Sequence, residues 1–330
     1  MNEQTIQSND ASCCSTLRAI LTAMRPAHWV KNVFVAAPIL TSGRFSDPAA
    51  WLRCLPAVGA FCLLSSSVYL INDVCDRDED RAHPVKCNRP VASGRLSVGA
   101  AVAAAILLMA IAATLTLIVV ELPNDGRQPL GGWGMGFWAF CYLVLNLVYC
   151  FWLRTHAVVD VLAIAMGFVL RAMAGAAAIA VPISPWLVLC TLTLCLFIAL
   201  AKRRSEIAEM PAAPATARKA NLGYTKDFLE HMLTVSTALA ILTYCIYCLA
   251  PQTISRIGSA HMVWTIPLVI YGMFRYYRAV HGAGCGDAVA VLVKDKIMWL
   301  VVAAFVVLTG LVIKFGSHAA IRSILDLRVR

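Results

Sequence analysis

The stretch "AVGAFCLLSSSVYLINDVCDRDEDRAHPVKCNRP", residues 57–90, joins an apolar run directly to a dense charged segment. The run Ala57–Ile71 carries no charged side chain, whereas Leu70–Pro90 carries five acids and four Lys or Arg residues. An uncharged run of this kind is typical of a helix in lipid, and the charges after it mark where the helix leaves the apolar layer. This junction decides the fold class and begins the candidate site.

The composition of the chain is that of an integral membrane protein. Of its 330 residues, 60% are hydrophobic and 14% are charged, against about 45–50% and about 25% in soluble domains. A bilayer core about 30 Å thick needs roughly 20 apolar residues per helical span. The sequence therefore predicts an all-α, polytopic membrane protein with about nine transmembrane helices, at Val30–Thr41, Cys54–Asp73, Val98–Val120, Trp133–Leu153, Ala157–Val181, Pro185–Ala201, Leu229–Ala250, Met262–Tyr276 and Ile297–Phe315.

Positive charge is distributed unequally between alternate connections. Of the 28 Lys and Arg residues, nineteen belong to the N-terminal side, with Lys31 and Arg275 at span ends counted there, and eight belong to the other side, with Lys314 counted there. Arg171 lies deep within the fifth span. The positive-inside rule predicts a cell-membrane protein with its N-terminus inside, its C-terminus outside and its charged loops on the cytoplasmic side. The net charge of +10 is then mainly membrane-surface charge, and no nucleic-acid partner is needed to explain it.

The domain prediction is a single membrane domain between two tails. Residues 1–27 form a cytoplasmic tail in which Cys13–Pro26 is a candidate interfacial helix, residues 28–316 form the transmembrane catalytic domain, and residues 317–330 form the C-terminal tail.

Three acids after the apolar run recur with helical spacing. If the helix continues past the run, about 100° per residue brings Asp73, Asp76 and Asp80 within an arc of roughly 60°. Asn72 stacks on Asp76 one turn later. Like charges this close repel one another, and Mg²⁺ relieves the repulsion, usually through one or two carboxylates together with substrate phosphates. The pattern predicts a metal–diphosphate site with the three aspartates as ligands; the alternative is an ordinary charged loop.

Cationic side chains follow the acids at once. Arg81, His83, Lys86 and Arg89 lie within nine residues of Asp80. Anion donors beside a metal cluster are what a polyphosphate substrate requires. The combination favours a polyphosphate site over a solvated loop.

Two ionisable residues lie inside the fifth predicted span. Charges in such positions cost about 2.5–3.5 kcal/mol on insertion scales and usually face a cavity or a partner. Asp160 lies near the cytoplasmic end and is the better candidate for an active cavity. Arg171 lies deep in the span, and both a pairing role and a bracing role are open for it.

Several segments resemble the UbiA superfamily of intramembrane prenyltransferases, in particular its decaprenyl-phosphate phosphoribosyltransferase branch. In chain order they are "RPAHWVKNVFVAAPIL" from Arg25, "YLINDVCDRDEDRAHPVKCNRP" from Tyr69, "VVDVLAIAMGFVLRAMAGA" from Val158, "AKRRSE" from Ala201 and "LGYTKDFL" from Leu222. The resemblance implies about nine helices around a central cavity. It also implies Mg²⁺-dependent transfer of 5-phosphoribose from phosphoribosyl diphosphate to a polyprenyl phosphate.

The resemblance also implies roles for individual residues. Asp73, Asp76 and Asp80 would hold Mg²⁺ and diphosphate as catalytic residues, and Asp160 begins the second acidic motif. The candidate substrate-binding residues are Lys31, Asn72, Arg81, Lys86, Arg89, Tyr149, Arg154, Lys202, Arg203 and Glu206.

The sequence departs from the pattern of the prenyl-diphosphate users. Their second motif reads D-x-x-x-D, whereas Asp160 is followed four residues later by Ile164. This difference favours the phosphoribosyl donor, with prenyl transfer to an aromatic acceptor as the alternative reaction. A transporter or channel lined by Asp160 and Arg171, or a non-catalytic lipid-binding protein, are the alternatives from other classes.

Overall fold

The computed structural model describes residues 15–122, 133–208, 223–282 and 295–316, and every regular element in these ranges is helical. Seven of these helices are long and apolar enough to cross a membrane, and the pair Pro251–Ile257 and His261–Val280, bent by 99°, is an eighth candidate. The all-α, multi-pass prediction is confirmed. The predicted segment Val30–Thr41 lies in the 3₁₀ helix η1 (Pro26–Asn32) and α2 (Val33–Thr41), so the count of nine stays a prediction.

The helices group into two compact units, each with its own apolar cores. Unit 1 comprises Met1–Ile39, Asp47–Arg154 and Leu170–Pro182, and unit 2 comprises Leu40–Ser46, Thr155–Val169 and Ile183–Arg330. The elements of unit 1 are η1, most of α2, α3 (Pro48–Cys75), α4 (Arg77–Ala82), η3 (Lys86–Asn88), α5 (Val98–Glu121), α6 (Gly134–Phe151) and the second half of α7 (Val159–Ala178). Those of unit 2 are the end of α2, η2 (Arg44–Ser46), the first half of α7, α8 (Pro185–Ala208), α9 (Lys226–Leu249), α10 (Pro251–Ile257), η8 (His261–Thr265), α11 (Ile266–Gly282) and α13 (Lys296–Phe315).

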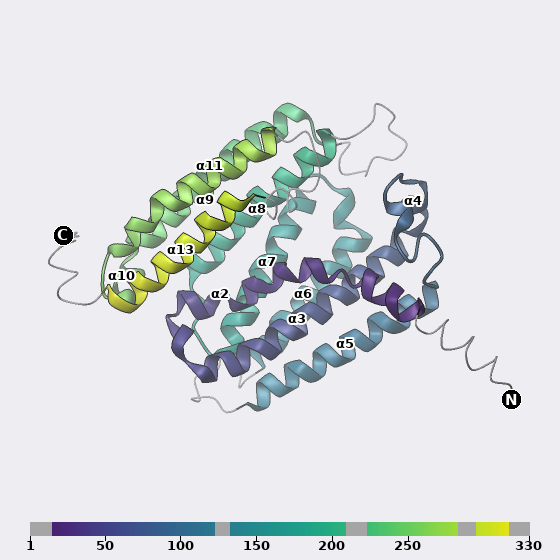
Figure 1. Ribbon diagram of the computed structural model, residues 1–330, viewed down its shortest axis with the longest axis horizontal. Helices are drawn as coiled ribbons and strands as arrows, with labels where there is room; N and C mark the ends of the chain where they lie inside the picture. The colour runs from purple at the N-terminus through teal and green to yellow at the C-terminus, as the bar shows by residue number, and fades with distance from the viewer. Residues whose placement is uncertain (1–14, 123–132, 209–222, 283–294, 317–330) are drawn as a thin grey trace. The chain divides into compact units, whose positions relative to one another are not determined.

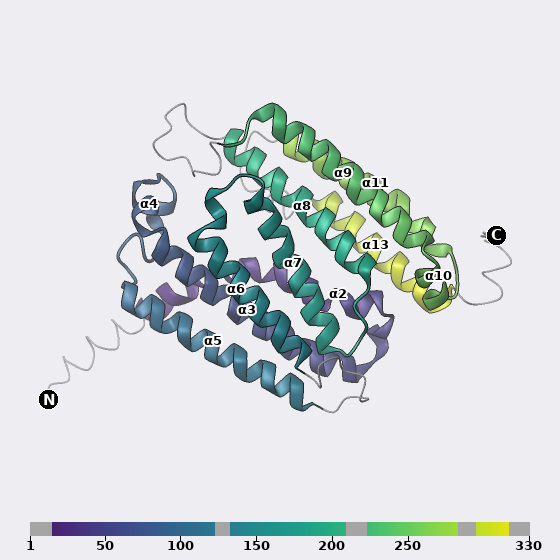
Figure 2. The same cartoon turned by 180° about the vertical axis from the view of Figure 1, so that it is seen from behind.

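Helix α3 carries the opening motif and is the central element of unit 1. Asp47 caps it by accepting a hydrogen bond from the Ala49 backbone N–H at 2.9 Å, and Pro48 occupies its first turn. Helix α5 lies beside α3 along its length (Figures 1 and 2). The buried Arg53 donates to Val119 O and Leu122 O at the end of α5, both at 3.1 Å. The guanidinium thereby satisfies helix-terminal carbonyls that lipid could not.

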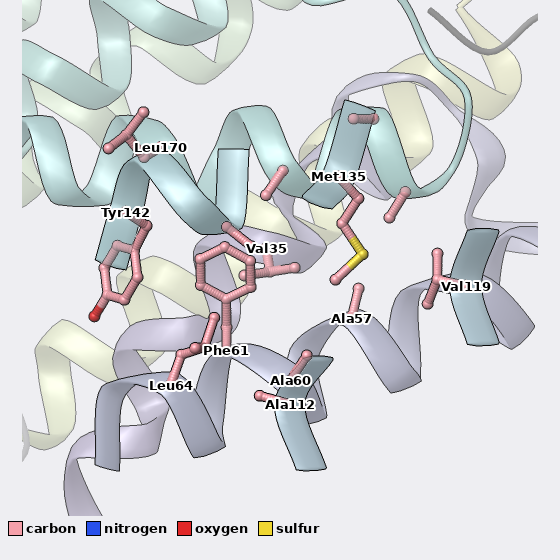
Figure 3. Packing of buried hydrophobic residues seen from close by; sticks show 14 residues of the cluster. Val35, Ala57, Ala60, Phe61, Leu64, Ala112, Val119, Met135, Tyr142 and Leu170 are labelled. Carbon is pink, nitrogen blue, oxygen red and sulfur yellow. The ribbon is translucent and has the colours of Figure 1, made fainter. Parts of the chain in front are cut away.

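A core cluster of unit 1 combines alanines and two aromatic rings with larger apolar side chains on α2, α3, α5, α6 and α7. Phe61 and Tyr142 are in ring contact at 5.2 Å between centroids, and alanines such as Ala57 and Ala112 let the helices approach closely (Figure 3). Gly175 of α7 makes the tightest approach, because a Cβ built there would lie 1.9 Å from the carbonyl oxygen of Val35.

The structure gives Arg171 partners and a bracing role within unit 1. Its Nε donates to Asn32 Oδ1 at 2.9 Å and one NH2 donates to the Tyr142 hydroxyl at 2.7 Å, with the guanidinium 4.5 Å from the Tyr142 ring. All three side chains are buried. The interactions supply the hydrogen bonds that a charge inside a membrane helix requires.

In unit 2, capping side chains set the starts of the last long helices. Thr225 caps α9, and Asp295 caps α13 while it binds Arg275 through two hydrogen bonds of 2.8 Å. Helix α8 extends to Ala208, beyond the predicted end at Ala201, so Lys202–Glu206 lie on a helix and not in a loop. Ion pairs of Arg203 with Glu206 and of Arg204 with Glu230 explain the extension, because they stabilise the added turns.

The N-terminal helix is described from residue 15 to residue 23. Ala19, Ala23 and Met24 pack into a core cluster with α3 and α5, while Leu17 and Leu21 are exposed. Residues 1–14 of the predicted tail, and the C-terminal tail 317–330, lie outside the described residues.

Candidate active site

The acidic motif sits where α3 gives way to α4 in unit 1. Helix α3 ends at Cys75, and Asp76, with φ −90° and ψ 4°, joins it to α4. Backbone hydrogen bonds of 2.8 Å from Asp76 N to Asn72 O and from Asp80 N to Asp76 O continue the helical pattern across this break. Asp73, Asp76 and Asp80 are all buried, with 1%, 8% and 3% of their surface exposed. The side chain of Asp78 is 91% exposed.

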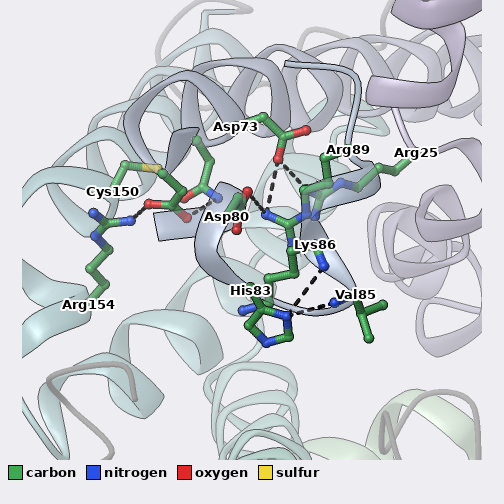
Figure 4. A network of polar contacts seen from close by, with 11 residues as sticks. Arg25, Asp73, Asp80, His83, Val85, Lys86, Arg89, Cys150 and Arg154 are labelled. Atoms are coloured by element: carbon green, nitrogen blue, oxygen red, sulfur yellow. Dashed lines mark hydrogen bonds and ion pairs between the residues drawn. The ribbon is translucent and has the colours of Figure 1, made fainter. Parts of the chain in front are cut away.

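Arg89 joins two of the buried carboxylates. Its NH1 lies 2.6 Å from Asp80 Oδ2 and 3.3 Å from Asp73 Oδ1. Arg25 forms a second ion pair with Asp73 Oδ1. Figure 4 shows Arg89 between the two carboxylates and Arg25 approaching from the side opposite Arg154. The negative charges of the motif are therefore interleaved with guanidinium groups, which offsets the cost of burying them.

Asp76 has separate partners. It forms an ion pair with Arg154 and accepts a hydrogen bond from Asn72 Nδ2 at 3.0 Å. Cys150, near the end of α6, donates to Asn72 Oδ1 at 3.5 Å. The structure thus confirms that the Asn72 amide and the Asp76 carboxylate meet.

Arg25 is held in a strained backbone conformation. Its φ of 53° and ψ of 61° are left-handed, although the following residue is Pro26, and residues before proline normally adopt extended conformations. Such strain persists where surrounding contacts enforce it. The guanidinium pairs with Asp73 and lies 5.0 Å from the Tyr69 ring. Sequence reasoning missed Arg25, and the available signal was its place as the first residue of the "RPAHWVKN" motif.

The donor set of this cluster fits a hard cation that completes its coordination with substrate oxygens. Asp73 Oδ2 is buried and has no hydrogen-bond partner, because both arginines contact Oδ1. Among the described residues, no three His, Cys, Asp or Glu side chains converge as a metal site. Mg²⁺ commonly uses only one or two carboxylates and takes its other ligands from phosphates and water. The cluster therefore fits Mg²⁺ bound together with a diphosphate better than Mg²⁺ held by protein alone.

The loop after α4 is organised by His83. Its Nδ1 accepts hydrogen bonds from the backbone N–H groups of Val85 and Lys86 at 3.2 and 3.3 Å. Burial, with a smaller effect of Lys86, lowers the pKa of His83, and the neutral ring is the form that accepts these bonds. Arg81 bonds Ala92 O at 3.0 Å and lies 3.7 Å from Asp78, away from the buried aspartates. The side chain of Lys86 is exposed.

Asp160 and two predicted substrate-binding residues at the end of α8, Arg203 and Glu206, form one cluster in unit 2. Arg203 Nε donates to Asp160 Oδ2 at 2.6 Å, and its NH1 contacts Glu206. Tyr224, which the sequence reasoning also missed, donates its hydroxyl to Asp160 Oδ1 at 2.6 Å. Tyr224 lies in the "LGYTKDFL" segment, but no local pattern links it to Asp160 across 64 residues.

The remaining candidates have simpler positions. Lys31 in η1, Tyr149 in α6 and Lys202 in α8 are each partly exposed. Their substrate-binding roles stay predictions.

Unit 2 also contains an apolar cavity of about 290 Å³ between α8, α9, α11 and α13. Its lining includes Leu194, Phe197, Tyr244, Met273 and Phe305, and no charged residue contributes to it. This cavity suits hydrocarbon and excludes a diphosphate, so the acidic cluster of unit 1 is the better candidate for the chemistry.

Comparison with known proteins agrees with this geometry. The model of the UbiA prenyltransferase family matches residues 33–289. The chain is 31% identical over 301 residues to decaprenyl-phosphate phosphoribosyltransferase of Mycobacterium tuberculosis, covering 90% of this chain and 95% of that protein. It is 30% identical to the protein of the same name from Mycolicibacterium smegmatis, covering 90% and 93%. A UbiA homologue from Archaeoglobus fulgidus solved with GPP and Mg²⁺ superposes with a TM-score of 0.64 at 17% identity, covering 90% and 99%.

Proposed function

Because the chain belongs to the UbiA prenyltransferase family, and is therefore a membrane-embedded transferase, we propose that it transfers 5-phosphoribose from phosphoribosyl diphosphate to a polyprenyl phosphate of decaprenyl type. Mg²⁺ is the proposed cofactor and diphosphate the second product. The observation that carries the proposal is the buried cluster in which Arg25 and Arg89 share Asp73 Oδ1 while Oδ2 has no hydrogen-bond partner. The relatives named decaprenyl-phosphate phosphoribosyltransferase support the choice of substrates.

The proposed reaction exchanges one bond at C1 of the ribose. The bond from C1 to diphosphate breaks, and a bond from C1 to an oxygen of the lipid phosphate forms. The lipid phosphate is already an anion at neutral pH, so it attacks without a general base. Both substrates are anionic, and cationic side chains must hold them together against their repulsion. Arg25, Arg89 and Arg154 already lie among the carboxylates and are the candidates for this task.

Asp73, Asp76 and Asp80 are the residues proposed to hold the metal. When bound, Mg²⁺ stabilises the negative charge that develops on the leaving diphosphate. The negative aspartates balance the positive charge of the metal ion. The arginines that pair with these aspartates are then able to contact phosphate oxygens. Bidentate guanidinium groups suit such oxygens better than ammonium groups do.

The distribution of Lys and Arg supports a membrane orientation for this site. We place the N-terminus and the α3–α4 junction on the cytoplasmic side of the cell membrane and the C-terminus outside. Phosphoribosyl diphosphate is a highly charged molecule and would reach the cluster from the aqueous side, while the polyprenyl tail stays among apolar helices or in lipid.

A donor comparison tests the proposal. With purified protein in detergent, Mg²⁺, radiolabelled phosphoribosyl diphosphate and decaprenyl phosphate, we expect label in the organic extract and none after chelation of the metal. A parallel reaction with a prenyl diphosphate and an aromatic acid should give no prenylated product. Product from the second reaction alone would replace this proposal by the prenyl-transfer alternative, and no product in either would favour a non-catalytic lipid-binding protein.

We expect Arg25→Ala to raise the KM for phosphoribosyl diphosphate about 10- to 100-fold, because charge-assisted hydrogen bonds contribute about 1.5–3 kcal/mol. The same change should tighten Mn²⁺ binding in the absence of substrate, since Arg25 competes with a metal for Asp73. Steady-state kinetics and Mn²⁺ titration measure the two effects.

The matched control is Arg18→Ala, which removes an exposed charge seven residues earlier in the same segment. It should change the KM for phosphoribosyl diphosphate and the affinity for Mn²⁺ by no more than about twofold each. Weaker Mn²⁺ binding by Arg25→Ala would contradict the competition between the arginine and the metal.

A further inference from the structure

The polar cluster around Asp160 lies within unit 2, and its central side chains are buried. Asp160 is fully buried, and each of its oxygens accepts a hydrogen bond of 2.6 Å, one from Arg203 Nε and one from the Tyr224 hydroxyl. Arg203 is 1% exposed, and its NH1 contacts Glu206, whose side chain is 33% exposed. The cluster therefore contains two carboxylates and one guanidinium between them.

The cluster is fixed in place by the turn before α7. The Tyr224 hydroxyl accepts a hydrogen bond from Val158 N at 2.7 Å. Val158 has a φ of 70°, which is a rare conformation for a β-branched residue and indicates that its surroundings enforce it. Gly223 approaches the same turn so closely that a Cβ on it would lie 2.8 Å from Ala157 Cβ. Burial and the bond to Asp160 raise the pKa of Tyr224, so its hydroxyl keeps the proton that it donates.

These residues do not fit a divalent metal. A metal at Asp160 would have to displace a guanidinium, and arginine cannot become neutral in a protein. Displacement would leave that cation buried and without its carboxylate, which is strongly unfavourable. The missing second acid at Ile164 agrees with this arrangement, because the cation is already balanced by Asp160 and Glu206.

We infer that Arg203 is a resident cation, a permanently charged side chain that occupies the place between Asp160 and Glu206 where a metal ion would otherwise bind. Asp160 is then a positioning residue that holds Arg203 and Tyr224. The chain binds one divalent metal, at the aspartates of α3 and α4. This last statement rests on the proposed function, whereas the role of Arg203 does not.

The test is the stoichiometry of Mn²⁺ binding without substrates, measured by titration calorimetry and by electron paramagnetic resonance on protein in detergent. We expect one Mn²⁺ per chain in the wild type and in Asp160→Asn, with affinities within about twofold. Arg203→Gln should gain a second, weaker Mn²⁺ site, because Asp160 and Glu206 lose their cation. The double variant Arg203→Gln with Asp160→Asn should lose that added site.

Arg203→Lys is the charge-conserving control and should remain at one Mn²⁺ per chain. A loss of bound Mn²⁺ in Asp160→Asn would overturn the inference, and that variant decides the question even if Arg203→Gln fails to fold. Absence of a gained site in folded Arg203→Gln would overturn it as well. A wild type that binds no Mn²⁺ would overturn the statement that the aspartates of α3 and α4 bind a metal without substrate, while a site gained in Arg203→Gln would still support the resident cation.

Discussion

Asp73→Asn should lower phosphoribosyl transfer by at least about 10²-fold, the size of loss seen when a group that stabilises developing charge is removed. The substitution keeps the shape of the side chain but removes its charge. Asp73 is 1% exposed and pairs with Arg25 and Arg89, so asparagine leaves both arginines without one carboxylate. It also replaces the buried Oδ2, the proposed metal ligand, by an amide group. Turnover at saturating Mg²⁺ measures the effect, and Mn²⁺ titration should reveal weaker binding.

Asp78→Asn is the matched control for this prediction. Asp78 lies in the same motif, but its side chain is 91% exposed and its ion pair with Arg81 is long, at 3.7 Å. Exposed pairs of this kind contribute little, so turnover should stay within about twofold of the wild type. Near-normal turnover in Asp73→Asn would remove the metal interpretation. Equal losses in both variants would indicate a general effect of negative charge instead of a defined site.

Gly175→Ala should have the largest effect on stability. The added Cβ would lie 1.9 Å from Val35 O and 2.7 Å from Val35 C. These are backbone atoms, so no side-chain rotation relieves the clash, and α7 must move away from α2. Overpacking typically costs about 1–3 kcal/mol and occasionally more, and we expect the upper end of this range or beyond. Thermal unfolding in detergent should give a clearly lower Tm, with a smaller yield of folded protein.

Gly310→Ala supplies the comparison. Gly310 also lies in the interior of a long helix, α13, but a Cβ there meets no heavy atom within 4 Å. Alanine has the higher helix propensity, so this variant should keep or slightly raise the Tm. A normal Tm for Gly175→Ala would mean that α2 and α7 do not approach as closely as the structure has them.

Much of the helical structure of both units follows from local sequence pattern. The apolar runs predict most helix ends to within a few residues. The larger differences are that α3 begins at Pro48 and not Cys54, α11 ends at Gly282 and not Tyr276, and ion pairs extend α8 beyond Ala201.

The spacing of Asp73, Asp76 and Asp80 predicts that they share one side of a helix. The structure buries all three and joins Asp73 and Asp80 through Arg89, but pairs Asp76 separately with Arg154. The spacing of the acids predicts one continuous helix, whereas the structure ends α3 at Cys75 and begins α4 at Arg77. Residue spacing does not reveal this break, because helical hydrogen bonds continue across it.

The partners of the acids could not be predicted in the same way. Arg25 and Asp73 are 48 residues apart, and Tyr224 and Asp160 are 64 apart. Arg81 and Lys86 are predicted as cations of the site because they lie near the motif in sequence, but the structure turns Arg81 toward Ala92 and leaves Lys86 exposed. Proximity to the motif in sequence therefore predicts that cationic side chains surround the aspartates, but it identifies only some of these side chains.

The sequence by itself determined that this protein is a bundle of membrane helices with an acidic cluster at the end of one of them. Both properties are local, since a helix in lipid must satisfy its own backbone hydrogen bonds and its periodicity sets which side chains share a face. The tertiary structure alone decided which arginine neutralises which carboxylate. That pairing depends on how separate helices pack, and the spacing of residues within one helix carries no information about its neighbours.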